Sequence, residues 1–405
     1  MVKRHRVNAG AWQKDAGVTL VELLVTMVIA GLVTSSTFLF FAGQKQVYET
    51  QTKLLNIQQN LWAAMETITR NLRAAGTGMV GCVRPDSDGI GADNGDPPPV
   101  SGPGNTPPAT GLRAFVNAAL VNATPFYGTG AARIAPLWIQ NGANGAPDAI
   151  IVAYGVGTSG NFADARLAST VPVGTPRSTI NTAAGLTTAF RNNEFIVLVD
   201  NTAIPLSGNF DRGCTLLQIV GITAGTNLLD TLSAGSLWNP TANLAPMVPF
   251  AYDATNAGIR NFGQLNWVRF AINAPVGGTP VLEMTRLDNP TLPPQTLAEG
   301  IEDLQVAFAC DLRGAAVGTP ADGTLIEDPS TLDEWTYNIA GDVPPVNGCN
   351  RPQAIRVTLL ARSLAPDENL RGLPNNRKPA VEDGIPGAFD MFRHRTISTT
   401  VFPRN

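Results

Sequence analysis

The chain has 405 residues, with 28 Lys and Arg against 32 Asp and Glu, and a formal net charge of −4. Charged residues make up 15% of it, well below the roughly 25% of an ordinary soluble domain. The small negative charge, with no basic block, argues against nucleic acid as a main partner. Because it has only two histidines, His5 and His394, an imidazole-based metal site or a Ser/His catalytic system is disfavoured.

The N-terminus is a basic leader followed by an apolar run. Residues 1–17 carry four bases and one acid, whereas residues 18–42, VTLVELLVTMVIAGLVTSSTFLFFA, contain a single charge, Glu22. A helix of that length measures about 38 Å and crosses a hydrocarbon core of about 30 Å. Because positive residues before such a run stay in the cytoplasm, we expect the remainder to be sent across the inner membrane.

Three processing routes compete for this segment. A secretory signal peptide needs small residues just after the apolar run, but Phe40-Phe41-Ala42-Gly43 stands there. A plain membrane anchor leaves Glu22 unexplained, because an ionised carboxylate in a bilayer is costly without a partner. Cleavage after Gly17 would make Glu22 the fifth residue of the mature chain, within reach of an α-amino group on a neighbouring subunit.

The sequence AG-VTLVELLVTMVIAGLV, residues 16–33, resembles the type IV prepilin signature. The resemblance implies that an inner-membrane prepilin peptidase cuts after Gly17 and methylates the new N-terminus, Val18. It also implies that Glu22 is the carboxylate that aids assembly into a filament. Val18 departs from the family, which most often has Phe at this position.

The helix is predicted to continue beyond the apolar run. Residues 44–75 contain no Pro and no Gly, and they carry a stripe with one polar interruption, Gln58. The stripe consists of Val47, Leu54, Leu61, Met65, Ile68 and Leu72. This amphipathic pattern, with Gly76-Thr77-Gly78 as a left-handed stop, predicts one helix over 18–75. We therefore divide the start of the chain into a leader, 1–17, a transmembrane and filament-core helix, 18–42, and its amphipathic continuation, 43–83.

An acidic and Pro-rich stretch, 84–111, opens the remainder of the chain. Four acids in it suggest calcium, because hard cations prefer clustered oxygens. These acids are Asp86, Asp88, Asp93 and Asp96. Their spacing does not match an EF-hand loop, and position 97 is Pro, so a solvated acidic loop is preferred and no metal site is predicted.

Residues 84–405 are expected to form an exported β-rich globular domain. Several apolar segments separated by Gly, Pro and Asn alternate in polarity, as strands of an antiparallel sheet with one buried face do. They are residues 148–156, 194–200, 214–222, 266–272, 281–287, 304–310, 354–361 and 394–402. The predicted fold class is α+β, with the long N-terminal helix packed on a mainly antiparallel β-rich domain.

No motif in the chain predicts catalysis or a cofactor. Residues 155–160 match GxGxxG after a strand, but no acid follows between 165 and 193, so turn glycines explain the match better than a dinucleotide site. Acid pairs such as Glu302-Asp303 are interpreted as solvated strand or turn residues rather than as catalysts.

Four cysteines, Cys82, Cys214, Cys310 and Cys349, lie beyond the membrane segment, and none forms a CxxC pair. In an oxidising compartment an even number predicts two disulfides, with three possible pairings. We favour Cys310–Cys349, whose loop is shortest, and therefore Cys82–Cys214.

The C-terminal part narrows the family. Residues 300–311, 354–363 and 393–405 resemble segments of PilW-type minor pilins, as does the helix sequence NLWAAMETITRNLRAAG. The resemblance implies a minor pilin that, with other minor pilins, the major pilin and the inner-membrane assembly machinery, primes type IV pilus assembly. It would then sit at the pilus tip on the cell surface.

Two other functions stay open. A type II secretion pseudopilin of the J kind shares the leader, the glutamate and the helix. Alternatively, the exported domain is a tip adhesin that binds a ligand or surface, with loops 84–111 and 364–385 as candidates.

Overall fold

The computed structural model describes part of the chain. The described residues are 18–79, 100–101, 112–116, 130–157, 164–172, 179–181, 189–200, 214–223, 228–231, 236–239, 251–289, 291–309, 325, 335–337, 353–371, 373 and 376–402. The chain divides into two compact units, Met1–Leu55 and Asn56–Asn405, and each is described by itself.

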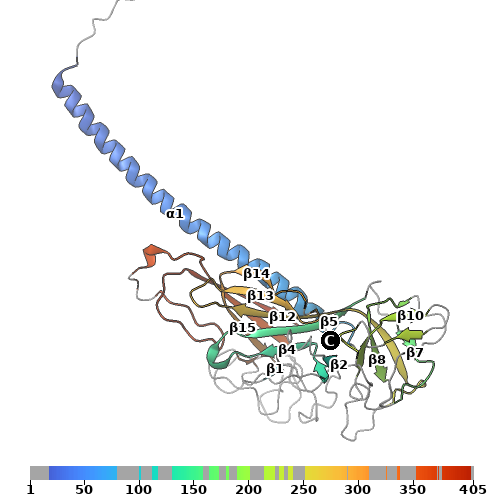
Figure 1. The fold of residues 1–405 in the computed structure, drawn as a ribbon. Coiled ribbons are helices and arrows are strands. Elements are labelled where there is room, and N and C mark those ends of the chain that lie inside the picture. The colour runs from blue at the N-terminus through green and yellow to red at the C-terminus, as the bar shows by residue number, and fades with distance from the viewer. Residues whose placement is uncertain are drawn as a thin grey trace, which may run out of the picture. The chain divides into compact units, whose positions relative to one another are not determined.

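One long helix, α1 (Leu20–Ala74), confirms the helix predicted over 18–75 (Figure 1). In the first unit every side chain from 18 to 49 is exposed. In the second unit the helix buries one face, consisting of Ile57, Leu61, Ala64, Met65, Ile68 and Leu72. Four members of the predicted stripe are among them, and Ile57 continues the face where Gln58 was expected to interrupt it. Val47, by contrast, is 52% exposed.

The helix ends at the predicted glycine stop. Gly76 and Gly78 have φ angles of 75° and 84°, in the left-handed region that glycine adopts without steric cost. The Gly76 N–H donates to the Ala153 carbonyl at 3.0 Å, and the Gly155 N–H donates to the Thr77 carbonyl at 2.8 Å. These two bonds attach the end of the helix to a central strand of the main sheet.

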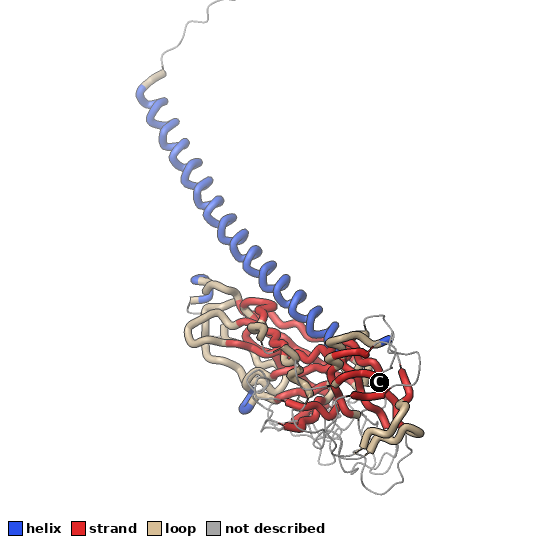
Figure 2. The backbone as a smooth tube through the Cα atoms, turned by 45° about the vertical axis from the view of Figure 1, so that its right-hand side comes forward, coloured by secondary structure: helices blue, strands red, loops and turns tan. Residues whose placement is uncertain are grey.

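The main sheet has 11 strands within the described residues, and most of its neighbouring pairs are antiparallel. Figure 2 draws the strands in red. The path of the sheet runs in the order β1 (Val100–Ser101), β4 (Leu137–Gln140), β5 (Ala149–Val156), β12 (Ala257–Asn273), β8 (Phe195–Asp200), β9 (Thr215–Gln218), β2 (Leu112–Val116) and β3 (Gly130–Ile134). Off this path lie β13 (Val281–Arg286), β14 (Gln295–Glu299) and β6 (Asp164–Arg166).

The strand β12 organises this sheet because it changes partners along its length. Its first part pairs with β6 and β8, and its second part pairs with β5 and β13. The change follows a bulge between Asn261 and Gly263. Phe262 and Trp267, both 0% exposed, lie in the large apolar cluster beside it.

Two smaller sheets complete the described part of the second unit. One has the order β16 (Trp335–Thr336), β15 (Ile301–Ala309), β17 (Ala354–Arg362) and β18 (His394–Val401). The other has the order β10 (Gly221–Thr223), β11 (Leu228–Asp230) and β7 (Thr179–Asn181). Two 3-10 turns, η1 (Ala143–Gly145) and η3 (Glu368–Leu370), lie in the connections.

Each of the eight predicted strand segments contains a strand, and the predicted α+β arrangement is confirmed. The segment 214–222 forms two strands, β9 and β10, rather than one. After the GxGxxG match, the next described residues form β6 rather than a helix, which agrees with the interpretation as turn glycines.

Candidate functional site

The start of α1 holds two residues predicted to matter, Val18 and Glu22. Thr19 caps the helix, because its carbonyl accepts the Leu23 N–H at 3.0 Å and its hydroxyl accepts the Glu22 N–H at 3.3 Å. Thr19 and Glu22 stand three residues apart, as the two members of a capping box do. Glu22 therefore lies in the first helical turn, where a negative charge is favoured by the helix dipole. Gly17, at the predicted cleavage point, lies outside the described residues.

The side chains in the apolar part of α1 are exposed. Within the described residues α1 is the one helix long and apolar enough to cross a membrane, and no side chain in its most apolar window is buried. Leu20, Met27 and Phe38 are 75%, 62% and 71% exposed. An apolar surface of this extent needs lipid or other helices around it. Glu22 is then the one acid placed among those neighbours.

Cys214 is 1% exposed and disulfide-bonded. The other three cysteines, Cys82, Cys310 and Cys349, lie outside the described residues. The pairing of the four stays a prediction.

The loop 84–111 with its four acids falls mostly outside the described residues, whereas the loop 364–385 is largely described. We call residues 376–393, which lead into β18, the strap. Within it the Asn376 side-chain amide donates to the Asp390 carbonyl at 2.7 Å and to the Phe392 carbonyl at 3.1 Å. The backbones of Arg377 and Phe389 form an isolated antiparallel β-bridge.

Polar contacts attach the strap to β15 and β17. The Lys378 Nζ lies 2.6 Å from the Asp303 Oδ2, and Arg356 donates to both carboxylate oxygens of Glu382, at 2.9 and 2.8 Å. At the end of the strap the Arg393 Nε donates to the Asp367 Oδ2 at 2.6 Å. The strap is therefore held on the sheet mainly by ion pairs and hydrogen bonds.

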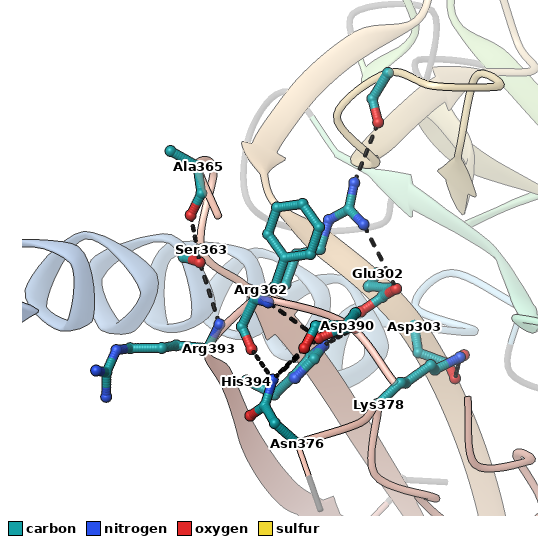
Figure 3. A network of polar contacts seen from close by, with 12 residues as sticks. Glu302, Asp303, Arg362, Ser363, Ala365, Asn376, Lys378, Asp390, Arg393 and His394 are labelled. Carbon is teal, nitrogen blue, oxygen red and sulfur yellow. Dashed lines mark hydrogen bonds and ion pairs between the residues drawn. The ribbon is translucent and has the colours of Figure 1, made fainter. Parts of the chain in front are cut away.

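A second polar group lies where the strap meets β18 (Figure 3). The His394 Nε2 is 3.2 Å from the Glu302 Oε2 and 3.3 Å from the Asp390 Oδ2, and the Arg362 Nη1 is 3.9 Å from Glu302. Burial raises the pKa of Glu302, but the hydrogen bond from His394 and the positive charges of Arg362 and Lys378 outweigh it and leave this pKa below its ordinary value.

The prediction that Glu302 and Asp303 are solvated was wrong. Asp303 is 0% exposed and is paired with Lys378, and the Glu302 side chain is only 20% exposed. Both stand on β15, and their partners lie about 75 and 90 residues later in the chain: Lys378 in the strap contacts Asp303, and His394 at the start of β18 contacts Glu302. Sequence spacing gives no sign of that proximity. The network ties segments together and holds no nucleophile beside a general base. Among the described residues, no three His, Cys, Asp or Glu side chains form a group that could hold a metal ion.

Comparisons with known proteins gave matches at both ends of the chain. Residues 269–405 match the family model of the type IV pilus-assembly protein W, PilW. Residues 12–38, which include Gly17, Val18 and Glu22, match the model of the prokaryotic N-terminal methylation motif. No curated protein and no solved structure matches the chain.

Proposed function

We propose that this chain, which belongs to the PilW family of type IV pilus-assembly proteins and carries an N-terminal methylation motif, is a minor pilin. In this proposal it primes pilus assembly and is incorporated at or near the pilus tip. The family makes it a structural subunit rather than an enzyme, with the pilus machinery as its partner. The motif implies processing by a prepilin peptidase. The observation that carries the proposal is a single acid, Glu22, at the start of an exposed apolar helix that could cross a membrane.

Processing is the first proposed step. The peptidase cuts after Gly17 and methylates Val18. Because Thr19 caps α1, the new N-terminus lies one residue before the cap, and the hydrogen bonds that Thr19 accepts from the Glu22 and Leu23 N–H groups are kept after cleavage. The mature chain waits in the inner membrane, anchored by residues 18–42 and with its N-terminus on the cytoplasmic side.

Assembly is the second proposed step. Glu22 moves from the membrane into a filament, where it pairs with the α-amino group of Val18 on an adjacent subunit. Pairing offsets the cost of burying the two charges, and removal of either partner leaves the other buried alone, at a cost of about 3–5 kcal/mol. Glu22 is thus required for entry into the filament rather than for folding of Asn56–Asn405.

The Glu22→Ala variant tests this assignment. We expect it to accumulate in the inner membrane at wild-type level, with mass spectrometry finding the mature N-terminus at Val18, yet to be missing from sheared pili. The matched control is Glu66→Ala, which removes an exposed acid of the same helix and should leave incorporation unchanged. Normal incorporation of the Glu22→Ala chain would refute the proposed role of Glu22.

Placement at the tip is tested with the same strains. Immunogold labelling of wild-type sheared pili should mark filament ends, and a deletion strain should make far fewer pili. Label along the whole shaft would refute the tip position. A normal pilus count with lost protein secretion would favour the type II secretion pseudopilin instead.

A further inference from the structure

Three buried carboxylates interact where the strap packs on β15. Asp148, Asp303 and Asp383 are 1%, 0% and 9% exposed, and they come from the loop just before β5, from β15 and from the strap. We call them the buried acid cluster. Burial raises the pKa of Asp148 well above its ordinary value, and the negative charges of Asp383 and Asp303 add to this shift. The charge of Asp303 also raises the pKa of Asp383, so the three carboxylates interact electrostatically.

Two members of this cluster have clear partners. The Asp148 carboxylate accepts the Gly142 N–H at 2.8 Å and the Val306 N–H at 2.7 Å. Asp303 accepts the Gln305 side-chain amide at 2.9 Å through Oδ1 and faces Lys378 through Oδ2. Both of these carboxylates therefore have hydrogen-bond or ion-pair partners within the described residues.

Asp383 differs, because its Oδ1 is buried with no hydrogen-bond partner. Two more buried atoms on the neighbouring elements also have none, namely the Gln305 Oε1 and the Asn141 Oδ1, and Gln305 is itself 0% exposed. All three atoms are oxygens that accept hydrogen bonds. What this place in the structure lacks is therefore a hydrogen donor, because a buried acceptor left without one is costly.

The polar and charged groups around Asp383 come from three parts of the structure. The loop before β5 contributes the neutral Asn141 and the acid Asp148, and β15 contributes Asp303. The strap contributes Glu382 and Lys378; Glu382 is paired with Arg356 of β17. Lys378, the remaining cation among these described residues, is committed to Asp303. An ionised Asp383 would thus be a further negative charge that no nearby cation neutralises.

We propose that Asp383 carries a proton while the strap is seated on β15, and that loss of this proton to solvent loosens the strap. The proton supplies the missing donor and removes the repulsion by the neighbouring carboxylates. Protonation of Asp383 thus controls whether the strap stays seated on β15, and this conclusion does not depend on the proposed function.

The direction of the pH effect follows from the position of Asp383. Burial, with the negative charges of Asp303 and Glu382, raises the pKa of Asp383 to about 6, although hydrogen bonds from Asn141 and the backbone oppose the shift. A group whose pKa is raised on closure stabilises the closed form fully below its open-state pKa, near 3.9 for Asp, and this stabilisation is lost as the pH rises through about 6. Acid therefore seats the strap, and neutral pH loosens it.

Hydrogen exchange on the full-length chain in detergent measures this directly. After correction for intrinsic exchange rates, we expect backbone protection of residues 378–387 to fall about tenfold between pH 5 and pH 7.5, given a closed-state pKa of about 6. In Asp383→Asn the amide is neutral and keeps a hydrogen donor, so protection should stay high at both pH values. The control Asp164→Asn, at a side chain 64% exposed, should keep the wild-type fall.

The outcomes that overturn the proposal are distinct. Equal backbone protection of residues 378–387 at pH 5 and pH 7.5 in the wild-type chain would overturn the proposal without any variant, even if Asp383→Asn fails to fold. A pH dependence that survives Asp383→Asn but vanishes in His394→Gln would assign it to the histidine between Glu302 and Asp390. Protection at pH 7.5 that rises with added Ca²⁺ would assign the unpartnered oxygens to a cation instead of a proton.

Discussion

Thr19 and Glu22 lie together at the start of the long helix, where the Thr19 hydroxyl accepts the Glu22 N–H. Glu22 is the one charge in residues 18–42, and it lies in the first turn of an exposed apolar helix; its role in assembly stays a prediction. A Thr three residues before a Glu at the start of an apolar run is a recognisable capping-box pattern, so the cap at Thr19 is predictable from the sequence. Thr19 thus caps the start of the helix, and in our proposal Glu22 beside it serves assembly.

The burial of Asp303 could not have been predicted from its neighbours in the chain. An acid next to another acid on a strand is normally solvated, because burying a charge without a partner is costly. Its partner, Lys378, lies 75 residues later in a segment with no regular structure. Only the fold brings the two together, and the same holds for Asp148 and Asp383.

Lys378 gives a prediction at this scale. Replacing it in Lys378→Met leaves the Asp303 carboxylate buried and without its cation, and removal of one partner of such a pair usually costs about 3–5 kcal/mol. We expect a loss of this size in the free energy of unfolding at neutral pH, measured by urea denaturation. Arg371→Met is the matched control, because Arg371 and Glu368 are 77% and 70% exposed at 3.8 Å, and its loss should stay below about 1 kcal/mol. Equal effects of the two variants would contradict the prediction.

Alternation of apolar and polar residues predicts strands that have one buried and one exposed face. It does not predict strands that lack this alternation. The long strand β12 was predicted only from 266 to 272, because Gly258 and Gly263 in its first half indicate turns. In the structure Gly263 forms a bulge that lets the strand continue and change partners. The polar edge strand β14 was missed because its exposed residues carry no apolar alternation.

Gly263 gives the prediction for this element. Its φ of 72° is strained for any residue with a Cβ, and an added Cβ would lie 2.0 Å from the Val156 carbonyl oxygen in β5. We expect Gly263→Ala to lower the free energy of unfolding by about 2 kcal/mol or more, measured in urea. Gly221→Ala on β10 is the control, because a Cβ there meets its nearest atom at 3.5 Å. A neutral Gly263→Ala would show that the bulge relaxes without cost.

At the scale of the whole molecule, the second compact unit includes the last part of the long helix. The sequence changes character after Cys82, and from this change 84–405 is predicted to be the exported domain. The compact second unit nevertheless begins at Asn56, and every buried residue of α1 lies at or after Ile57. Periodicity identified that face of the helix, but what it packs against is decided by distant strands and could not be derived locally.

The final prediction concerns which fragment folds. A chain of residues 56–405 keeps the buried face of α1, whereas a chain of residues 76–405 loses all six of its apolar side chains, Ile57, Leu61, Ala64, Met65, Ile68 and Leu72. Each large apolar side chain stabilises by about 1.5–3 kcal/mol when fully buried, so the sum approaches the 5–15 kcal/mol of a whole domain.

We therefore expect fragment 56–405 to elute as a monomer in gel filtration and to unfold cooperatively on heating, while fragment 76–405 aggregates or lacks a transition. Ile68→Ala within 56–405 should cost about 2–5 kcal/mol because Ile68 is 0% exposed, whereas Trp62→Ala, at a side chain 67% exposed, should cost little. A stable fragment 76–405 would mean that the strands of the second unit close their core without the helix. In that case the helix would be a stalk rather than part of the fold.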